Sequence, residues 1–351
     1  MMAPLALPEP VAEALGRMLD PARTGQGAGQ GAMIERYRNR REPGAAGLVS
    51  DAERRAYLRH RFPATFAAVS AALATMPPAL AAGIADAVDL GAGTGASAAA
   101  AAVRLPGLTA MTIIDSDRAA LALAEPLVAA ANPDLAVTTR TADAAAGLAR
   151  VHSGGADLVM ASYLLNELPG DRADTVTDAM WHSARRAVLI VEPGSRVGFA
   201  ALIRARQRLI DLGARLLAPC PHVRACPMGE PGQGDDWCHF PLGYDDPFED
   251  QQGRSTEKIS FVLAILPSDE TDADGIASPA DNRIVKAPMR RTGHVVLDLC
   301  TRSGTLERRT VTRRQGKDYK AARAADWGDA WPDTQAGDLS GGPSDTEGDP
   351  S

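Results

Sequence analysis

The stretch Val88-Asp-Leu-Gly-Ala-Gly-Thr-Gly-Ala96 decides the fold of this chain. It follows a short β-like run and precedes an alanine-rich helical segment, so its three glycines stand where a strand meets a helix. Glycine lets the backbone turn sharply at such a point and lets a ligand approach the helix N-terminus closely. The same spacing also satisfies the dinucleotide fingerprint, and a tight turn in any α/β protein is a further alternative.

Around this loop, from residue 84 to 215, short β-like runs alternate with helical segments. Such alternation implies parallel strands joined by crossover helices, and hence a doubly wound α/β sheet. A long helix is expected over Val197–Leu217, after the last strand. The predicted strands are Ala85–Leu90, Ala110–Ile114, Ala136–Thr139, Asp157–Met160 and Ala187–Val191.

The composition divides the chain into four regions. Residues 1–80 are predicted to be helical, with Ser50 as the N-cap of one helix. Residues 84–217 form the predicted α/β domain. Residues 218–325 lose the alternation and hold all four cysteines and a basic block. Residues 333–351 are rich in Gly, Ser and Asp without periodicity, and they are predicted to be a disordered acidic tail.

The overall composition excludes several classes of protein. The chain has 351 residues, of which 45% are hydrophobic and 23% charged, as in ordinary globular proteins. Its longest apolar stretch, around Ala96–Val103, is too short to cross a bilayer, so no membrane contact is expected. The N-terminus lacks the basic and apolar parts of a signal peptide, and its acids argue against a transit peptide. We therefore expect a cytoplasmic protein that is monomeric when free.

The net charge of −7 is unevenly distributed along the chain. From Asp326 to the end there are seven acids and no base, whereas residues 283–323 hold twelve bases against three acids. A basic block of this kind fits contact with RNA, and arginine is the better phosphate ligand, although a solvated basic face is the alternative. The candidate RNA ligands are the arginines near a predicted turn and strand: Arg302, Arg308, Arg309, Arg313 and Arg314.

Two acidic residues near the glycine loop indicate which ligand it takes. Asp89 stands two residues before the first glycine, where a carboxylate can hold a ligand's ammonium group but would repel a pyrophosphate. This charge favours S-adenosylmethionine over NAD, and a nicotinamide oxidoreductase is the weaker alternative. Asp115 ends the next strand and is placed to accept both ribose hydroxyls. The predicted cofactor site is thus Asp89, Gly91, Gly93, Gly95 and Asp115.

The loop resembles motif I of class I methyltransferases. By that resemblance Asp143, after the third strand, is positioned to accept the adenine amino group. The fourth strand ends in Ala161–Pro169, where such enzymes hold the methyl acceptor, but no Asn-Pro-Pro-Tyr box is present. Asn166 and Glu167 are the candidate catalytic residues there, and capping of the next helix is the alternative role.

All four cysteines lie in the C-terminal part of the chain, at Cys220, Cys226, Cys238 and Cys300. Four thiolates complete a structural zinc site or a [4Fe–4S] cluster. Disulfides are disfavoured in the cytosol, and four unrelated buried cysteines are another alternative. Zinc sites usually contain a closely spaced cysteine pair, which this sequence lacks. Two Cys-Pro steps favour a [4Fe–4S] cluster, with zinc as the alternative.

The segments around the cysteines resemble the methyltransferase-like family of ribosomal small-subunit proteins, which includes the mitochondrial small-subunit assembly factor and bacterial homologues. The resemblance runs from about Tyr57 to Pro332. It is strongest in Ala218–His222, Cys226–Met228, Asp236–Phe240 and Arg291–Cys300.

The resemblance implies a class I methyltransferase-like fold that binds S-adenosylmethionine, a [4Fe–4S] cluster on the four cysteines, and contact with rRNA of the small ribosomal subunit. One departure is the acidic stretch Asp245–Asp250, where a basic one is expected. Two functions follow as hypotheses. The chain is either a methyltransferase acting on ribosomal RNA or protein, or a non-catalytic assembly factor that keeps the fold and the cluster.

Overall fold

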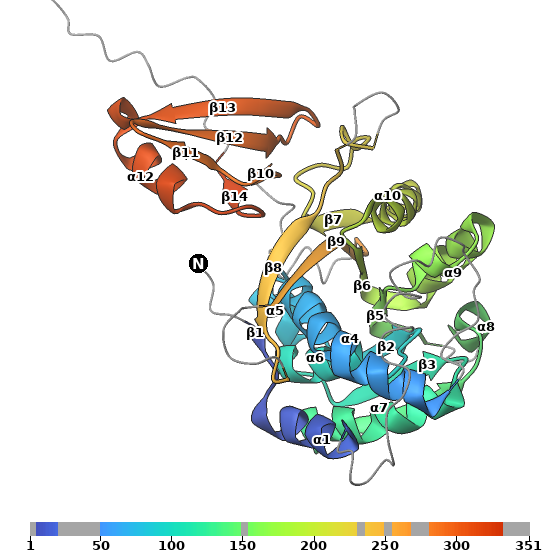
Figure 1. Cartoon of the computed structure of the whole chain (residues 1–351). Helices are drawn as coiled ribbons and strands as arrows, with labels where there is room; N and C mark the ends of the chain where they lie inside the picture. The colour runs from blue at the N-terminus through green and yellow to red at the C-terminus, as the bar shows by residue number, and fades with distance from the viewer. Residues whose placement is uncertain are drawn as a thin grey trace, which may run out of the picture.

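The computed structural model describes residues 5–19, 50–148, 154–229, 236–248, 255–267 and 281–332 (Figure 1). The predicted disordered tail, 333–351, lies outside these residues.

The larger of two sheets contains all five predicted strands, and they are parallel to one another. The chain runs outward through β2, β3 and β4, then returns to the other side of β2 with β5 and β6. This order confirms the doubly wound α/β sheet. The strands are β2 (Asp86–Leu90), β3 (Ala110–Asp115), β4 (Ala136–Thr141), β5 (Ala156–Ser162) and β6 (Ala184–Pro193).

Beyond β6 the sheet continues with antiparallel pairing. The strand β9 (Ser255–Ile265) pairs with β6, and its other edge carries β7 (Arg215–Ala218) and β8 (Phe240–Asp245). A short strand β1 (Leu5–Ala6) completes the sheet beside β8. Five parallel strands followed by an antiparallel one form a class I methyltransferase-like fold. Strands of the predicted α/β domain, 84–217, and strands of the region after it therefore form one sheet.

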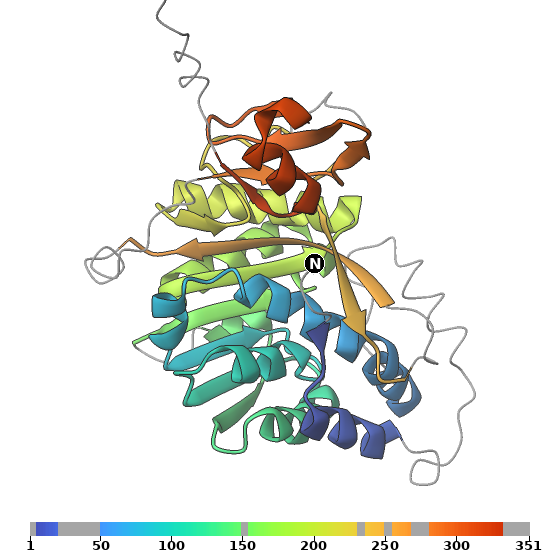
Figure 2. The same cartoon turned by 90° about the vertical axis from the view of Figure 1, so that its left-hand side faces the viewer.

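Helices cover both faces of this sheet (Figures 1 and 2). One face carries the N-terminal helices and those after β2 and β3, and the other carries the helices after β4, β5 and β6. Ser50 is the N-cap of α4, as predicted, and its hydroxyl accepts a hydrogen bond from the Glu53 amide. The first group is α1 (Glu9–Leu19), α4 (Asp51–Leu73), α5 (Pro78–Ala82), α6 (Ala96–Arg104) and α7 (Arg118–Ala131), and the second is α8 (Ala144–Leu148), α9 (Gly170–Ser183) and α10 (Arg196–Asp211).

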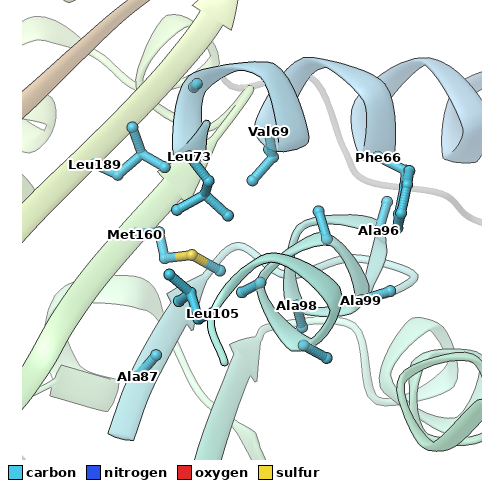
Figure 3. Packing of buried hydrophobic residues seen from close by; sticks show 14 of the residues in the cluster. Phe66, Val69, Leu73, Ala87, Ala96, Ala98, Ala99, Leu105, Met160 and Leu189 are labelled. Atoms are coloured by element: carbon cyan, nitrogen blue, oxygen red, sulfur yellow. The ribbon is translucent and has the colours of Figure 1, made fainter. Parts of the chain in front are cut away.

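The core beneath α4 explains the alanine-rich sequence of α6. Phe66 and Leu73 of α4 project toward α6 and the sheet, and Ala96 at the start of α6 lies next to Phe66 (Figure 3). Alanine is the best helix former and leaves room for a second helix to approach closely. The glycine loop is thereby held against a tightly packed layer.

The predicted helix Val197–Leu217 ends earlier than expected, and that prediction was wrong at its C-terminal end. The helix α10 stops at Asp211, because Gly213 adopts a left-handed conformation with φ +98°. The amide of Gly213 donates to the Ile210 carbonyl, and the next amide donates to the Leu209 carbonyl. These bonds satisfy the last carbonyls of the helix, and the apolar residues that follow form β7.

A second, smaller sheet contains most of the basic block. Its strands are antiparallel and enclose a separate small core that includes Val295, Leu297 and Trp331. No helix in the described ranges has the length and apolar character needed to cross a membrane. The strands of this sheet are β10 (Asn282–Ile284), β11 (Met289–Arg291), β12 (His294–Cys300), β13 (Leu306–Thr312) and β14 (Ala330–Trp331), and the helix α12 (Lys317–Ala324) packs beside them.

Candidate functional site

The glycine loop lies at the carboxyl end of β2, next to the point where the strand order reverses. Ligands of doubly wound sheets bind at such switch points. Gly91, Gly93 and Gly95 all have positive φ, at 66°, 52° and 83°. A Cβ on Gly91 would lie 2.9 Å from Leu164, whereas one on Gly93 would meet nothing within 4 Å. The loop is therefore packed on one side and open at Gly93.

Asp89 lies at the base of this loop and is fully buried. Within the described residues neither of its carboxylate oxygens accepts a hydrogen bond of ordinary geometry, although the backbone amide of Ala98 lies near enough to favour the carboxylate. Burial raises the pKa of Asp89 to about 8, and the nearby Asp115 adds to the shift. A buried carboxylate without a partner is costly, and a cationic group would relieve that cost. The residue fits the ammonium group of S-adenosylmethionine.

Asp115 stands at the end of β3, facing the loop. Its Oδ2 accepts a hydrogen bond of 2.8 Å from the Gly93 amide, and its Oδ1 accepts one of 2.7 Å from the Asp117 amide. Burial raises its pKa, and these two amides oppose that effect. Each carboxylate oxygen can accept a further hydrogen bond. Asp115 therefore holds the loop in place and keeps the acceptor capacity that ribose hydroxyls require.

Asp143 follows β4 and lies at the same edge of the sheet. Its Oδ1 accepts a hydrogen bond from the Ala145 amide at the start of α8, and its Oδ2 forms an ion pair with Arg172. About half of the Asp143 side chain is exposed, 49%. Asp143 is thus less enclosed than Asp89, and its predicted role toward adenine stays a prediction.

The candidate catalytic residues lie in a 3-10 helix, η1 (Leu165–Glu167), just after β5. With its amide nitrogen turned toward the two acceptors, Asn166 donates to Glu192 Oε2 at 2.7 Å and to the Tyr163 carbonyl at 3.3 Å. Neither candidate caps the next helix, because Pro169 occupies that position without a side-chain bond. The side-chain amide of Asn166 is therefore already hydrogen-bonded within the protein.

Glu192 is a buried acid that the sequence analysis did not select. It lies near the end of β6, and its carboxylate accepts hydrogen bonds from the backbone amides of Leu165 at 2.8 Å and Asn166 at 3.4 Å. Burial raises its pKa to about 8, and the two amides oppose the shift. The sequence carried a signal for it, since Glu192 directly follows a predicted strand, as Asp115 does.

A second missed group joins the N-terminal helix α4 to this edge of the sheet. Arg61 of α4 donates to Glu257 of β9 at 3.0 Å, and its guanidinium lies 5.1 Å from the centre of the Tyr163 ring. Tyr163 has a left-handed backbone, with φ 55°. A non-glycine residue in that conformation is held by its surroundings and is typical of functional sites. No sequence signal identified this group.

The four cysteines line one small cavity of about 30 Å³ between the two sheets. Two of them lie after β7, one precedes β8, and the fourth ends β12 of the small sheet, so residues from both sheets line the cavity. All four thiols are free. In the described part of the chain, no three His, Cys, Asp or Glu side chains lie close enough together to hold a single metal ion. The cysteines of this cavity are Cys220, Cys226, Cys238 and Cys300.

Two arginines face the same cavity, Arg206, which is buried, and Arg283, which is half-buried. Arg206 is only 2% exposed, and its Nε donates to the Cys220 sulfur at 3.3 Å. Arg283 donates to the carbonyls of Pro219 and Gly328. Neither arginine forms a salt bridge with a carboxylate in the described ranges. Buried cations require a negative partner, so the chemistry of this set fits thiolates that hold a metal or cluster.

The two histidines beside the cysteines differ in their surroundings. His222 Nε2 lies 3.4 Å from the Cys300 sulfur, whereas its Nδ1 is buried without a partner. Burial, followed by Arg206, lowers the pKa of His222 to about 4. His239 instead bonds to the Trp237 carbonyl. Only His222 therefore lies against the cysteine cavity.

The five candidate RNA-binding arginines do not form one cluster. On β13, Arg308 pairs with Asp298 at 2.8 Å, and Arg309 pairs with Glu307 at 2.8 Å. Acids on the same sheet therefore offset both charges. Arg302 lies in the turn at one end of β13, and Arg313 and Arg314 lie in the 3-10 helix η2 (Arg313–Gln315) at the other end.

Two curated relatives match part of the chain. The Rsm22-cox11 tandem protein 2, mitochondrial, of Schizosaccharomyces pombe is 29% identical over 182 residues, 41% of this chain and 24% of that protein. The ribosome assembly protein RSM22, mitochondrial, of Saccharomyces cerevisiae is 25% identical over 240 residues, 41% of this chain and 38% of that protein. The matched part therefore spans well under half the length of these relatives.

Two solved structures that match this chain at low identity carry the name methyltransferase. Magnesium protoporphyrin IX methyltransferase of Synechocystis PCC 6803 with bound SAM is 14% identical, with a TM-score of 0.39, and covers 69% of this chain and 100% of its own. A putative RNA methyltransferase of Pyrococcus horikoshii is 13% identical, with a TM-score of 0.35, and covers 56% of this chain and 83% of its own.

These comparisons correct one prediction and confirm another. Both curated relatives are named as mitochondrial proteins, which overturns the prediction of a cytoplasmic location. The family model described as "Mitochondrial small ribosomal subunit Rsm22" matches residues 51–332. This match confirms the resemblance to ribosomal small-subunit proteins, and the chain belongs to the Rsm22 family.

Proposed function

We propose that this chain binds S-adenosylmethionine at the glycine loop and acts on the small ribosomal subunit, to which it binds through RNA. The observation that carries the cofactor assignment is the buried carboxylate of Asp89, whose two oxygens accept no hydrogen bond of ordinary geometry from the described residues. Gly93 is open on the ligand side, and Asp115 supplies acceptors beside it. Family membership supports the ribosomal partner.

In this proposal each residue of the loop has a distinct task. Asp89 pairs with the ammonium group, and Asp115 accepts the ribose hydroxyls while its bond to Gly93 fixes the loop. Asp143 accepts the adenine amino group at the open edge of the site. When bound, S-adenosylmethionine supplies an electrophilic methyl group. A pyrophosphate ligand such as NAD would face the carboxylate of Asp89 and is disfavoured.

We also propose that the cysteine cavity holds a [4Fe–4S] cluster. It is supported by the four thiols and by Arg206 and Arg283, which line the cavity without a carboxylate salt bridge in the described ranges. A cubane presents one iron to each cysteine, whereas a zinc ion needs all four sulfurs within about 2.3 Å of one point. The two Cys-Pro steps, at Cys220 and Cys226, are the feature that favours the cluster over zinc.

The test of the main proposal is incubation of the protein with immature small subunits and S-adenosylmethionine labelled in the methyl group. We expect the protein to co-sediment with the subunits, and label in RNA or protein to rise above a control with Asp89→Asn. Failure to bind either the cofactor or the subunit would refute the proposal.

A second function is supported by the engagement of Asn166. Its side-chain amide donates to Glu192 and to the Tyr163 carbonyl, and the segment after the fourth strand lacks the Asn-Pro-Pro-Tyr box that would hold a methyl acceptor. A cofactor-binding assembly factor without methyl transfer fits this arrangement. In the same experiment this function predicts co-sedimentation and cofactor binding with no transfer of label, so one assay separates the two.

A further inference from the structure

An arginine-lined pocket on the small sheet has no role in the site described above. It is open to solvent, measures about 500 Å³, and is distinct from the cysteine cavity. Only one of its arginines, Arg313, belongs to the set selected from the sequence. The residues that define this arginine pocket are Arg290, Arg291, Gly293, Arg313, Tyr319 and Arg323.

Three elements meet to build the pocket. The hairpin between β11 and β12 turns at Gly293, whose φ of +87° suits a tight turn. The amide of Arg313, at the start of η2, donates to the Gly293 carbonyl at 3.0 Å. Arg290 of β11 donates to the Arg323 carbonyl near the end of α12, also at 3.0 Å. The walls are thus tied to one another by hydrogen bonds.

The charges in the pocket are unbalanced. Arg290 pairs with Asp326 at 3.1 Å. Arg291, Arg313 and Arg323 are exposed and form no salt bridge in the described part of the chain. Arg323 and Arg313 also lower the pKa of Tyr319, so both guanidiniums lie near its hydroxyl. Three cations therefore surround one opening without an acidic partner.

We propose that the arginine pocket binds consecutive phosphate groups of an RNA backbone. This inference rests on the proposed function, in which the chain meets ribosomal RNA, and it names residues for that contact. Guanidinium groups match phosphate in a two-pronged geometry, and a phosphodiester chain offers an acceptor to each of three arginines. The open shape admits a chain that passes through the pocket. An acidic peptide is the competing ligand.

The test compares two triple variants of the full-length protein with equal changes in charge. The pocket variant carries Gln at Arg291, Arg313 and Arg323. The matched variant carries Gln at Arg302, Arg308 and Arg309, the rival candidates from the sequence, which lie outside the pocket in the turn before β13 and on β13. Binding of a labelled oligouridylate is measured between 50 and 200 mM salt, with inorganic pyrophosphate and polyglutamate as competitors.

Three lost contacts to a single strand should reduce the salt slope by about 2 units. The wild type should then lose affinity about 20-fold more than the pocket variant between 50 and 200 mM salt. The matched variant should keep the wild-type slope, and pyrophosphate should compete better than polyglutamate. Equal slopes in the two variants, or stronger competition by polyglutamate, would overturn the proposal.

Two further measurements separate this inference from the proposed function. Calorimetry with S-adenosylmethionine should give the same affinity for both triple variants, since the glycine loop lies in the other sheet, and this also shows that both have folded. Co-sedimentation of the wild type with small subunits tests the proposed function alone. If the wild type co-sediments while the pocket variant keeps its oligouridylate slope, only the inference about the pocket has failed.

Discussion

The buried carboxylate of Asp89 predicts that binding of S-adenosylmethionine releases a proton. The pKa of Asp89 is raised to about 8 in the free protein, so the group is mostly protonated at pH 7. A bound ammonium favours the ionised carboxylate and lowers that pKa. Binding at pH 7 should therefore release about 0.9 proton per site, and affinity should rise about tenfold per unit between pH 6 and 7. The ligand's own amino group stays protonated in this range.

The assay is titration calorimetry at pH 7 in buffers of different ionisation enthalpy, with Asp89→Asn as the matched variant. The variant should release no proton from this position, and its affinity should not change between pH 6 and 7. A charged hydrogen bond contributes about 1.5–3 kcal/mol, but deprotonation at pH 7 offsets about 1.4 kcal/mol of this. The variant should therefore bind up to about tenfold more weakly at pH 7, and the difference should grow toward pH 8.

Two controls make this prediction refutable. S-adenosylhomocysteine has the same ammonium group and should release the same proton, whereas NAD should release none. Without ligand, the folded pKa of Asp89 lies above the ordinary value of 3.8, so the wild type should lose stability relative to the variant as pH rises from about 4 to 8. Equal proton release by wild type and variant would show that Asp89 does not meet the ammonium.

Four other predictions follow from the same structure. Anaerobic purification should give a brown protein with about four irons per chain, and Cys226→Ser should lose the colour; a colourless protein with one zinc would contradict the cluster. Asp115→Ala should weaken S-adenosylmethionine binding by about 1–3 kcal/mol in calorimetry, and unchanged binding would argue against its contact with ribose. Glu192→Ala should destabilise the fold by about 1–3 kcal/mol in urea unfolding, since the buried Leu165 amide and the half-buried Asn166 amide lose their acceptor; a smaller change would mean that water replaces it. Deleting residues 333–351 should leave RNA affinity unchanged or raise it, because the acidic tail can compete for the arginines, and a weaker affinity would oppose this.

The sequence allowed the parallel strands to be predicted because each is a short apolar run next to a helical segment. It failed at Val197–Leu217, where an apolar run continued beyond the helix. Periodicity alone does not distinguish a helix from a short buried strand, and Gly213 was the only local signal of the break. The antiparallel addition of β9 to β6 depends on contacts distant in sequence, which no local pattern encodes.

The candidate site shows the same division between local and distant information. Asp89 and Asp115 were predictable because each stands at a fixed position relative to a strand and the glycine loop. The group that includes Arg61 and Glu257 was not, since its members come from α4 and β9, and only the folded sheet brings them together. The order of charges along the chain also does not show which arginines are paired with acids, because strand pairing places Asp298 opposite Arg308 and offsets its charge.

The position of the cysteines suggests why one chain combines a cofactor fold with a basic sheet. Three cysteines belong to segments that join β7 to β8, and Cys300 belongs to β12, so any group they hold connects the small sheet to the large one. The small sheet has only a limited core of its own, and small cores are marginally stable without a staple. We therefore expect that filling the cysteine site stabilises the sheet that carries the arginine pocket, and that the proposed RNA contact depends on the proposed cluster.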